Sequence, residues 1–142
     1  MAVPRKEKAY EKYAWIIFFA LGIVFLVQAA VSIVTGRPLD AFVQGSIGMS
    51  WTQLVTAQPR IAGFISHLST SNGIIAAVAD VSVIAISFRS YRRGEKWAWY
   101  TFLAVPILFG LATIITTPDN LLFAIIAAVG LLLPYRKFFP KK

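Results

Sequence analysis

Four long apolar runs, separated by shorter polar segments, dominate the chain. They lie at about 14–34, 61–88, 97–117 and 118–139. A helix of about 20 apolar residues is long enough to cross the hydrocarbon core of a bilayer. The pattern therefore predicts an all-α fold in which residues 1–142 form a single domain of four transmembrane helices, an integral membrane four-helix bundle.

The ends of the runs carry helix-breaking residues. Gly36 and Pro38 follow the first run, and Pro134 is expected to kink or end the fourth. Thr117, Pro118 and Asp119 have the order of a helix start, with a cap, a proline at the first helical position and an acid near the positive end of the dipole. The third and fourth spans should therefore form a tight hairpin.

The second run is too long for a simple span. It has 28 residues, which extend over about 42 Å as a helix, against a hydrocarbon core of about 30 Å. Its first third is polar, from Ser66 to Gly73. We expect this third to project from the bilayer.

The connection over residues 35–60 contains a local helix signal. Ser50 is a suitable N-cap, Gln53 follows three residues later, and Met49 is placed to meet Leu54. This is the spacing of a capping box with a hydrophobic staple. It predicts a short interfacial helix over about 51–57, stopped by Pro59.

That short helix should place the apolar side chains of Trp51, Leu54 and Val55 on one face. Such a face lies on the membrane surface or against a partner, unless the helix closes over its own bundle. Both alternatives remain open at this point. The candidate partner contacts on this side are Met49, Trp51, Leu54, Val55 and His67.

Basic residues are distributed unevenly around the runs. Of 14 Lys and Arg residues, 12 precede the first run, separate the second from the third, or follow the fourth; the others are Arg37 and Arg60. Lys and Arg accumulate on the cytoplasmic side of short loops. The pattern predicts a multi-pass protein of the cell membrane with both termini in the cytoplasm.

The net charge of +8 would suggest nucleic acid in a soluble protein. Here the cations flank apolar spans, so anionic lipid at the inner face is the expected partner and nucleic acid is not. Aromatic side chains at the same level support this, since they favour the membrane interface. The residues expected to anchor the chain to lipid are Arg92, Arg93, Lys96, Trp97 and Trp99.

The residue inventory excludes several chemistries. There is no cysteine and a single histidine, His67, so a metal site built on several imidazoles or thiolates within one chain is excluded. No phosphate-binding glycine loop, nucleophile elbow or carboxylate pair occurs. We predict no catalytic residue, metal or cofactor; the chain is not an enzyme alone, although it can belong to an enzyme complex.

Asp80 is the one acid in the interior of a predicted span, away from the helix starts. It lies eight residues from Phe88, about 12 Å inside the hydrocarbon, and ionisable residues at such depth suggest function. Three roles are considered: a hydrogen bond to the Phe102 carbonyl that Pro106 leaves free, a contact to a subunit or ligand, or proton-linked chemistry. An enzyme site with His67 is disfavoured, since the two lie about 20 Å apart along the helix.

Other small and polar positions within the spans suit close helix packing and interhelical hydrogen bonds. The intramembrane polar and packing candidates are Asp80, Gln28, Ser69, Gly73 and Pro106.

Three segments carry a resemblance to a family. They are YRRGEKWAWY at 91–100, GMSWTQL at 48–54 and PRIAGFI at 59–65. In these segments the chain resembles uncharacterised small prokaryotic four-span membrane proteins with an RRGEKWAWY-type inner loop. The resemblance covers about Gly48–Tyr100 and implies topology, with no activity attached.

Together these features favour a non-catalytic integral membrane subunit or accessory protein. It would pack against larger membrane partners, with a respiratory or monooxygenase-type complex as a natural host, or against further copies of itself. The alternative is a binder or carrier of a lipid or small solute in which Asp80 acts as a proton-linked switch.

Overall fold

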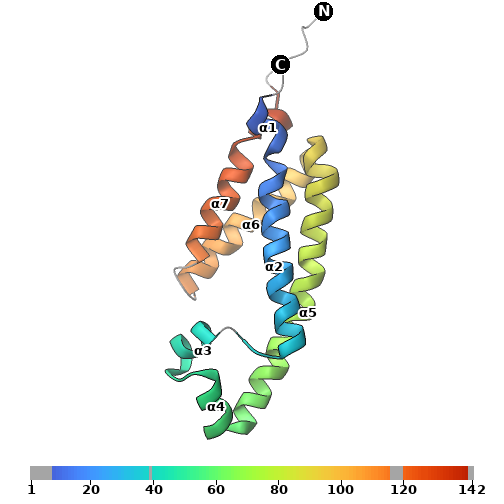
Figure 1. Ribbon diagram of the computed structural model, residues 1–142. Coiled ribbons are helices and arrows are strands. Elements are labelled where there is room, and N and C mark those ends of the chain that lie inside the picture. The colour runs from blue at the N-terminus through green and yellow to red at the C-terminus, as the bar shows by residue number, and fades with distance from the viewer. Residues whose placement is uncertain (1–7, 39, 116–119, 141–142) are drawn as a thin grey trace, which may run out of the picture. The chain divides into compact units, whose positions relative to one another are not determined.

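A computed structural model describes residues 8–38, 40–115 and 120–140 (Figure 1). Every regular element in these ranges is a helix. Three helical stretches are long and apolar enough to cross a membrane: Ala9–Thr35, Pro59–Tyr91 and Lys96–Ile115. The fold is therefore all-α, and these helices are those of a membrane protein.

The long helices lie where the apolar runs predicted them. They are α2 (Trp15–Thr35), α5 (Pro59–Ile86) and α6 (Lys96–Ile115). Helix α5 has 28 residues, which confirms that the second run forms one over-long helix. The fourth run contains α7 (Asn120–Leu132), which is shorter. The helix start predicted at Thr117, Pro118 and Asp119 lies outside the described residues.

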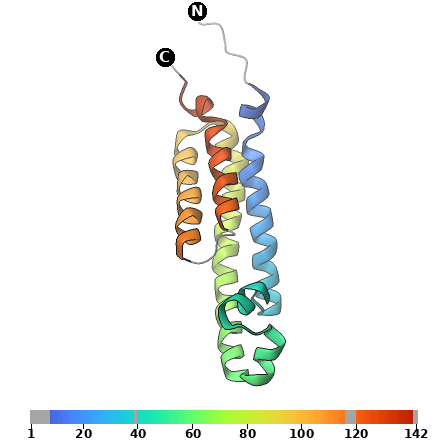
Figure 2. The ribbon, with the colours of Figure 1, turned by 90° about the vertical axis from the view of Figure 1, so that its left-hand side faces the viewer.

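The chain divides into two compact units, to which α2 and α5 both contribute. The first unit comprises Met1–Leu21 and Val83–Lys142, and the second comprises Gly22–Ser82. The first unit also holds α1 (Ala9–Tyr13), the π-helix η1 (Ser87–Tyr91) and α8 (Tyr135–Phe138). Within it, α6 and α7 lie side by side (Figure 2).

Aromatic side chains form the core of the first unit. The Phe18 ring stacks on Phe102 with centroids 4.3 Å apart, and its centroid lies 5.2 Å from that of Tyr91. Tyr91 in turn packs on Phe138 at 4.7 Å. All four are buried. This core fixes the end of α2 against η1, α6 and α8, because each ring comes from a different element.

The π-helix η1 was not predicted from the sequence. It continues α5, and the N–H of Arg92 donates to the carbonyl of Ser87, five residues earlier. The Ser87 hydroxyl donates to the Val83 carbonyl over 2.7 Å. Such widened turns are uncommon and often occur at functional sites.

The short helix predicted in the second unit is α4 (Trp51–Ala57), and its capping box is confirmed. The Ser50 hydroxyl accepts from the Gln53 N–H at 3.3 Å, and the Ser50 N–H donates to the Gln53 side-chain oxygen at 2.9 Å. Pro59 not only ends this segment but begins α5. A proline suits a first helical position because no N–H is needed there.

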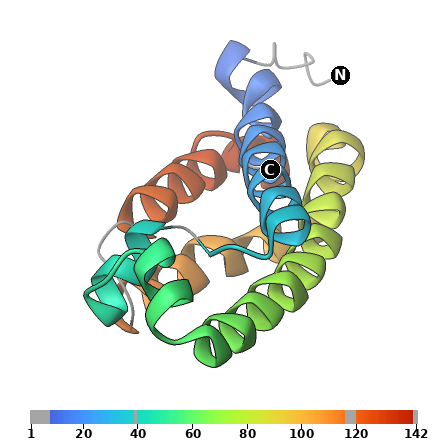
Figure 3. The same cartoon turned by 60° about the horizontal axis from the view of Figure 1, so that its bottom comes forward.

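A second short helix, α3 (Asp40–Ile47), precedes α4 and was not predicted (Figure 3). Gly48 follows its last residue and stops the helix, with a φ of +77° that favours glycine. The Gly48 N–H donates to the Gln44 carbonyl at 2.9 Å. Val43 of α3 packs with Trp51 and Leu54 of α4 and Ala62 of α5, which together form the core of the second unit.

Candidate functional site

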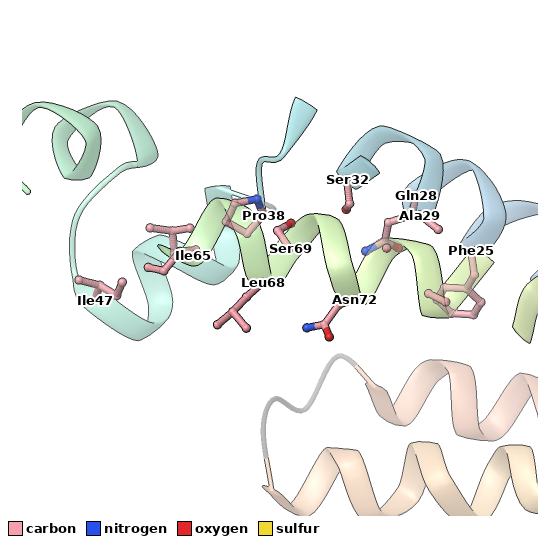
Figure 4. A pocket seen from close by; sticks show the side chains of 13 residues that line it. Phe25, Gln28, Ala29, Ser32, Pro38, Ile47, Ile65, Leu68, Ser69 and Asn72 are labelled. Carbon is pink, nitrogen blue, oxygen red and sulfur yellow. The ribbon is translucent and has the colours of Figure 1, made fainter. Parts of the chain in front are cut away.

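A groove of about 520 Å³ opens in the second unit between α2, α3 and α5 (Figure 4). We call it the Gln28 groove. Most of its lining is apolar, from residues such as Phe25, Ile65 and Leu68, and its polar lining residues are Gln28, Ser32, Ser69 and Asn72. Its walls are therefore hydrophobic, with hydrogen-bonding groups at a few points, as in many binding grooves.

Close contact between two helices sets one wall of the groove. A Cβ atom added to Gly73 of α5 would lie 3.1 Å from the Ala29 carbonyl oxygen and 3.0 Å from Cγ1 of Ile33, both on α2. Gly73 is itself buried. The structure thus places this predicted packing residue at a close approach of α2 and α5, and small residues allow such an approach in membranes.

The two amide side chains of the groove have no hydrogen-bond partner in the described part of the chain. Gln28 and Asn72 are exposed, and neither side chain forms a hydrogen bond with any residue that the structure describes. Moving an amide side chain from water into hydrocarbon without a hydrogen-bond partner costs from about 1 kcal/mol to several kcal/mol of free energy. The groove therefore suits an occupant that offers both apolar surface and a hydrogen-bonding group.

Asp80 lies farther along α5 and is half-buried. Its Oδ2 atom is buried and has no hydrogen-bond partner among the described residues. Pro106 lies inside α6. The predicted hydrogen bond from Asp80 to the Phe102 carbonyl stays a prediction.

The predicted partner contacts differ in their surroundings. Trp51 and Leu54 are buried in the core of the second unit, with Met49 packed against them. Val55 is 43% exposed, and His67 is also exposed. The side chains of Trp51 and Leu54 thus pack inside the second unit. This agrees with the alternative in which the short helix packs on its own chain and not on a partner.

A second cavity, also of about 520 Å³, lies in the first unit. It is lined by Phe88, Arg89, Arg92 and Arg93, and we call it the arginine pocket. The Arg92 guanidinium carbon lies 5.4 Å from the Trp15 ring centroid and 5.5 Å from that of Phe88. Both distances are in the range of cation–π attraction.

The other predicted lipid anchors take different roles. Trp97 is exposed and its indole N–H donates to Glu95 Oε2 over 2.6 Å. The Nζ atom of Lys96 lies 5.6 Å from the Phe139 ring centroid. Trp99 is half-buried and donates to the Leu131 carbonyl over 3.1 Å, so it serves the packing of the first unit.

Sequence reasoning missed the role of Tyr91. Its buried hydroxyl donates to the Gly130 carbonyl over 2.7 Å. Pro134 lies four residues after Gly130 and has no N–H, so this carbonyl cannot receive the usual helical hydrogen bond. Pro134 indicates from the sequence that the Gly130 carbonyl lacks its helical donor. Nothing near it in the sequence indicates that the donor is Tyr91, 39 residues from Gly130.

The described residues contain no cluster of three or more His, Asp or Glu side chains that could hold a metal ion. Comparisons with protein families, curated proteins and solved structures give no significant match.

Proposed function

We propose that this protein is a non-catalytic integral membrane subunit or accessory protein that receives a helix of a larger membrane partner in the Gln28 groove. The observation that carries the proposal is the pair of exposed amides, Gln28 and Asn72, without partners in the described part of the chain. They line one apolar groove from two different helices.

A partner helix fits these walls better than lipid tails do. Acyl chains fill an apolar groove but cannot form hydrogen bonds with amides. Association of helices in membranes uses close packing at small residues and interhelical hydrogen bonds from Asn, Gln, Ser and Thr. The groove offers both. Gly73 and Ala29 are small residues at the close approach of two helices, and Ser69 and Asn72 line the groove with hydrogen-bonding groups.

The proposal includes the topology that the charge pattern predicts. Four spans, with both termini in the cytoplasm, leave the basic ends at the inner face, where anionic lipid anchors them. A respiratory or monooxygenase-type complex stays part of the hypothesis as the host. A second copy of the chain is the competing occupant.

Native membranes can be solubilised in mild detergent and their complexes separated by native gel electrophoresis, which tests this function. The wild-type protein should migrate within a larger complex. Replacing both amides, Gln28→Leu with Asn72→Leu, should release it, because leucine keeps the groove filled and apolar but removes the hydrogen bonds. Ile74→Leu is the matched control, on an exposed position of α5 outside the groove lining. Migration of the wild type as a free small protein would refute the proposal.

A second candidate function rests on Asp80, whose buried Oδ2 atom lacks a partner in the described residues. In this alternative the protein binds or carries a lipid or small solute, and Asp80 is its proton-linked switch. Asp80→Asn separates the two cases. Proton movement into proteoliposomes should vanish in a carrier, whereas a subunit held together by Asp80 should still assemble, since the amide also donates.

A further inference from the structure

We propose that the arginine pocket binds the phosphate group of an anionic membrane phospholipid. Its three guanidinium groups, from Arg89, Arg92 and Arg93, line one cavity with the ring of Phe88. The site lies in the first unit and shares no residue with the Gln28 groove. It rests on the membrane topology of the proposed function, but it stands or falls independently of the partner helix proposed for the Gln28 groove.

Arg92 is held in place before any ligand arrives. Its guanidinium lies against the rings of Trp15 and Phe88, and its backbone carbonyl accepts a hydrogen bond of 2.9 Å from Lys137 Nζ. A planar guanidinium fixed in this way loses little freedom when it binds phosphate through two parallel hydrogen bonds. The Arg92 guanidinium is thus better ordered than a cation without ring contacts.

The three arginine side chains have no acidic ion-pair partner among the described residues. None of them forms an ion pair with a described residue. Two acids of the first unit form other hydrogen bonds: Glu95 accepts from the Trp97 indole at 2.6 Å, and the buried Glu11 accepts from the Lys8 N–H at 3.1 Å. Three like charges around one cavity repel each other, and a phosphate group relieves that repulsion.

The surroundings favour a lipid over free phosphate. Phe88 is 53% exposed and borders the guanidinium groups, so a ligand that carries apolar surface beside its phosphate gains contact there. The pocket also lies at the end of the candidate span Pro59–Tyr91. Phospholipid headgroups occupy that level of a bilayer.

Native mass spectrometry of the full chain in detergent, with added lipid, tests the proposal. Phosphatidylglycerol should remain bound where phosphatidylcholine with the same acyl chains does not. Arg92→Lys keeps the charge but loses the planar fork and the stacking, so affinity should fall about 2- to 5-fold. Arg136→Lys, on an exposed position of α8, is the matched control and should change nothing.

Arg93→Lys is a second variant, since Arg93 is exposed and its replacement spares the packing around Trp15. It should also weaken phosphatidylglycerol binding while the melting temperature stays that of the wild type. Equal effects of Arg92→Lys and Arg136→Lys would overturn the proposal, because a diffuse basic surface depends on charge alone. Displacement of the lipid by an equal concentration of inorganic phosphate would overturn the lipid assignment.

Discussion

The hydroxyl group of Tyr91 donates a hydrogen bond of 2.7 Å to the carbonyl oxygen of Gly130, the acceptor that Pro134 cannot serve. Two features of the fold meet in this contact. The π-helix η1 ends at Tyr91, and α7 ends two residues before Pro134. Tyr91 thus ties the end of η1 to the last turn of α7 within the first unit.

Tyr91→Phe should lower the free energy of unfolding by about 1 kcal/mol, because it leaves the buried Gly130 carbonyl without a donor. Unfolding in mixed detergent micelles measures the change. Tyr100→Phe is the control, since Tyr100 is 58% exposed and should show no loss. In a Pro134→Ala background a backbone N–H becomes available to the Gly130 carbonyl, so the cost of Tyr91→Phe should shrink. An unchanged cost in that background would argue against this explanation.

Trp99→Phe should also destabilise the protein, through loss of the indole hydrogen bond to the Leu131 carbonyl. The matched substitution is Trp97→Phe, since the Trp97 indole N–H donates a solvent-exposed hydrogen bond to Glu95. We expect about 1 kcal/mol for Trp99 and less than about 0.5 kcal/mol for Trp97. The same micelle unfolding experiment gives both values, and similar losses would show that the Leu131 contact adds little.

Gly73→Ala should separate α2 from α5, since its new Cβ atom would approach the backbone of Ala29. The expected loss is about 1–3 kcal/mol. Gly63→Ala, on the same helix, meets nothing within 4 Å and should stabilise the helix by up to about 1 kcal/mol. Opposite signs in thermal unfolding support the tight contact. A gain in stability for both would contradict it.

Ser50→Ala should fray the start of α4, because the side chain that caps the Gln53 N–H is lost. The expected cost is about 1 kcal/mol, and Ser50→Asp should restore most of it. Hydrogen exchange of the amides in Trp51–Ala57 reports this locally. If Ser50→Ala leaves that protection unchanged, packing of Trp51 and Leu54 alone holds the helix.

Local signals in the sequence predicted the parts of the fold that depend on local physics. Ser50 and Gln53 need only their spacing to form a capping box, and the long apolar runs need only their length to form helices. Helix α3 was missed because its apolar pattern is weak, although Gly48 offered a stop signal. The π-helix was missed because no short-range pattern marks its widened turn, which ends at the buried Tyr91.

The candidate sites show the same division. Gln28, Ser69 and Gly73 were identified as intramembrane polar or packing residues, yet their common groove depends on how α2 and α5 approach at Ala29. Arg92 and Arg93 were identified as basic anchors. The contact of the Arg92 guanidinium with the Trp15 ring, far away in the chain, required the three-dimensional arrangement.

Site-specific crosslinking in native membranes tests the central claim most directly, and the absence of cysteine from the chain makes each introduced thiol unique. Gln28→Cys and Asn72→Cys place a photo-crosslinker in the groove, while Ala30→Cys and Ile74→Cys place it at exposed positions outside the groove lining. We predict that both groove positions crosslink to one larger membrane protein and that the controls do not. Equal crosslinking from all four positions, or groove crosslinks only to lipid or to a second copy of this chain, would contradict the account.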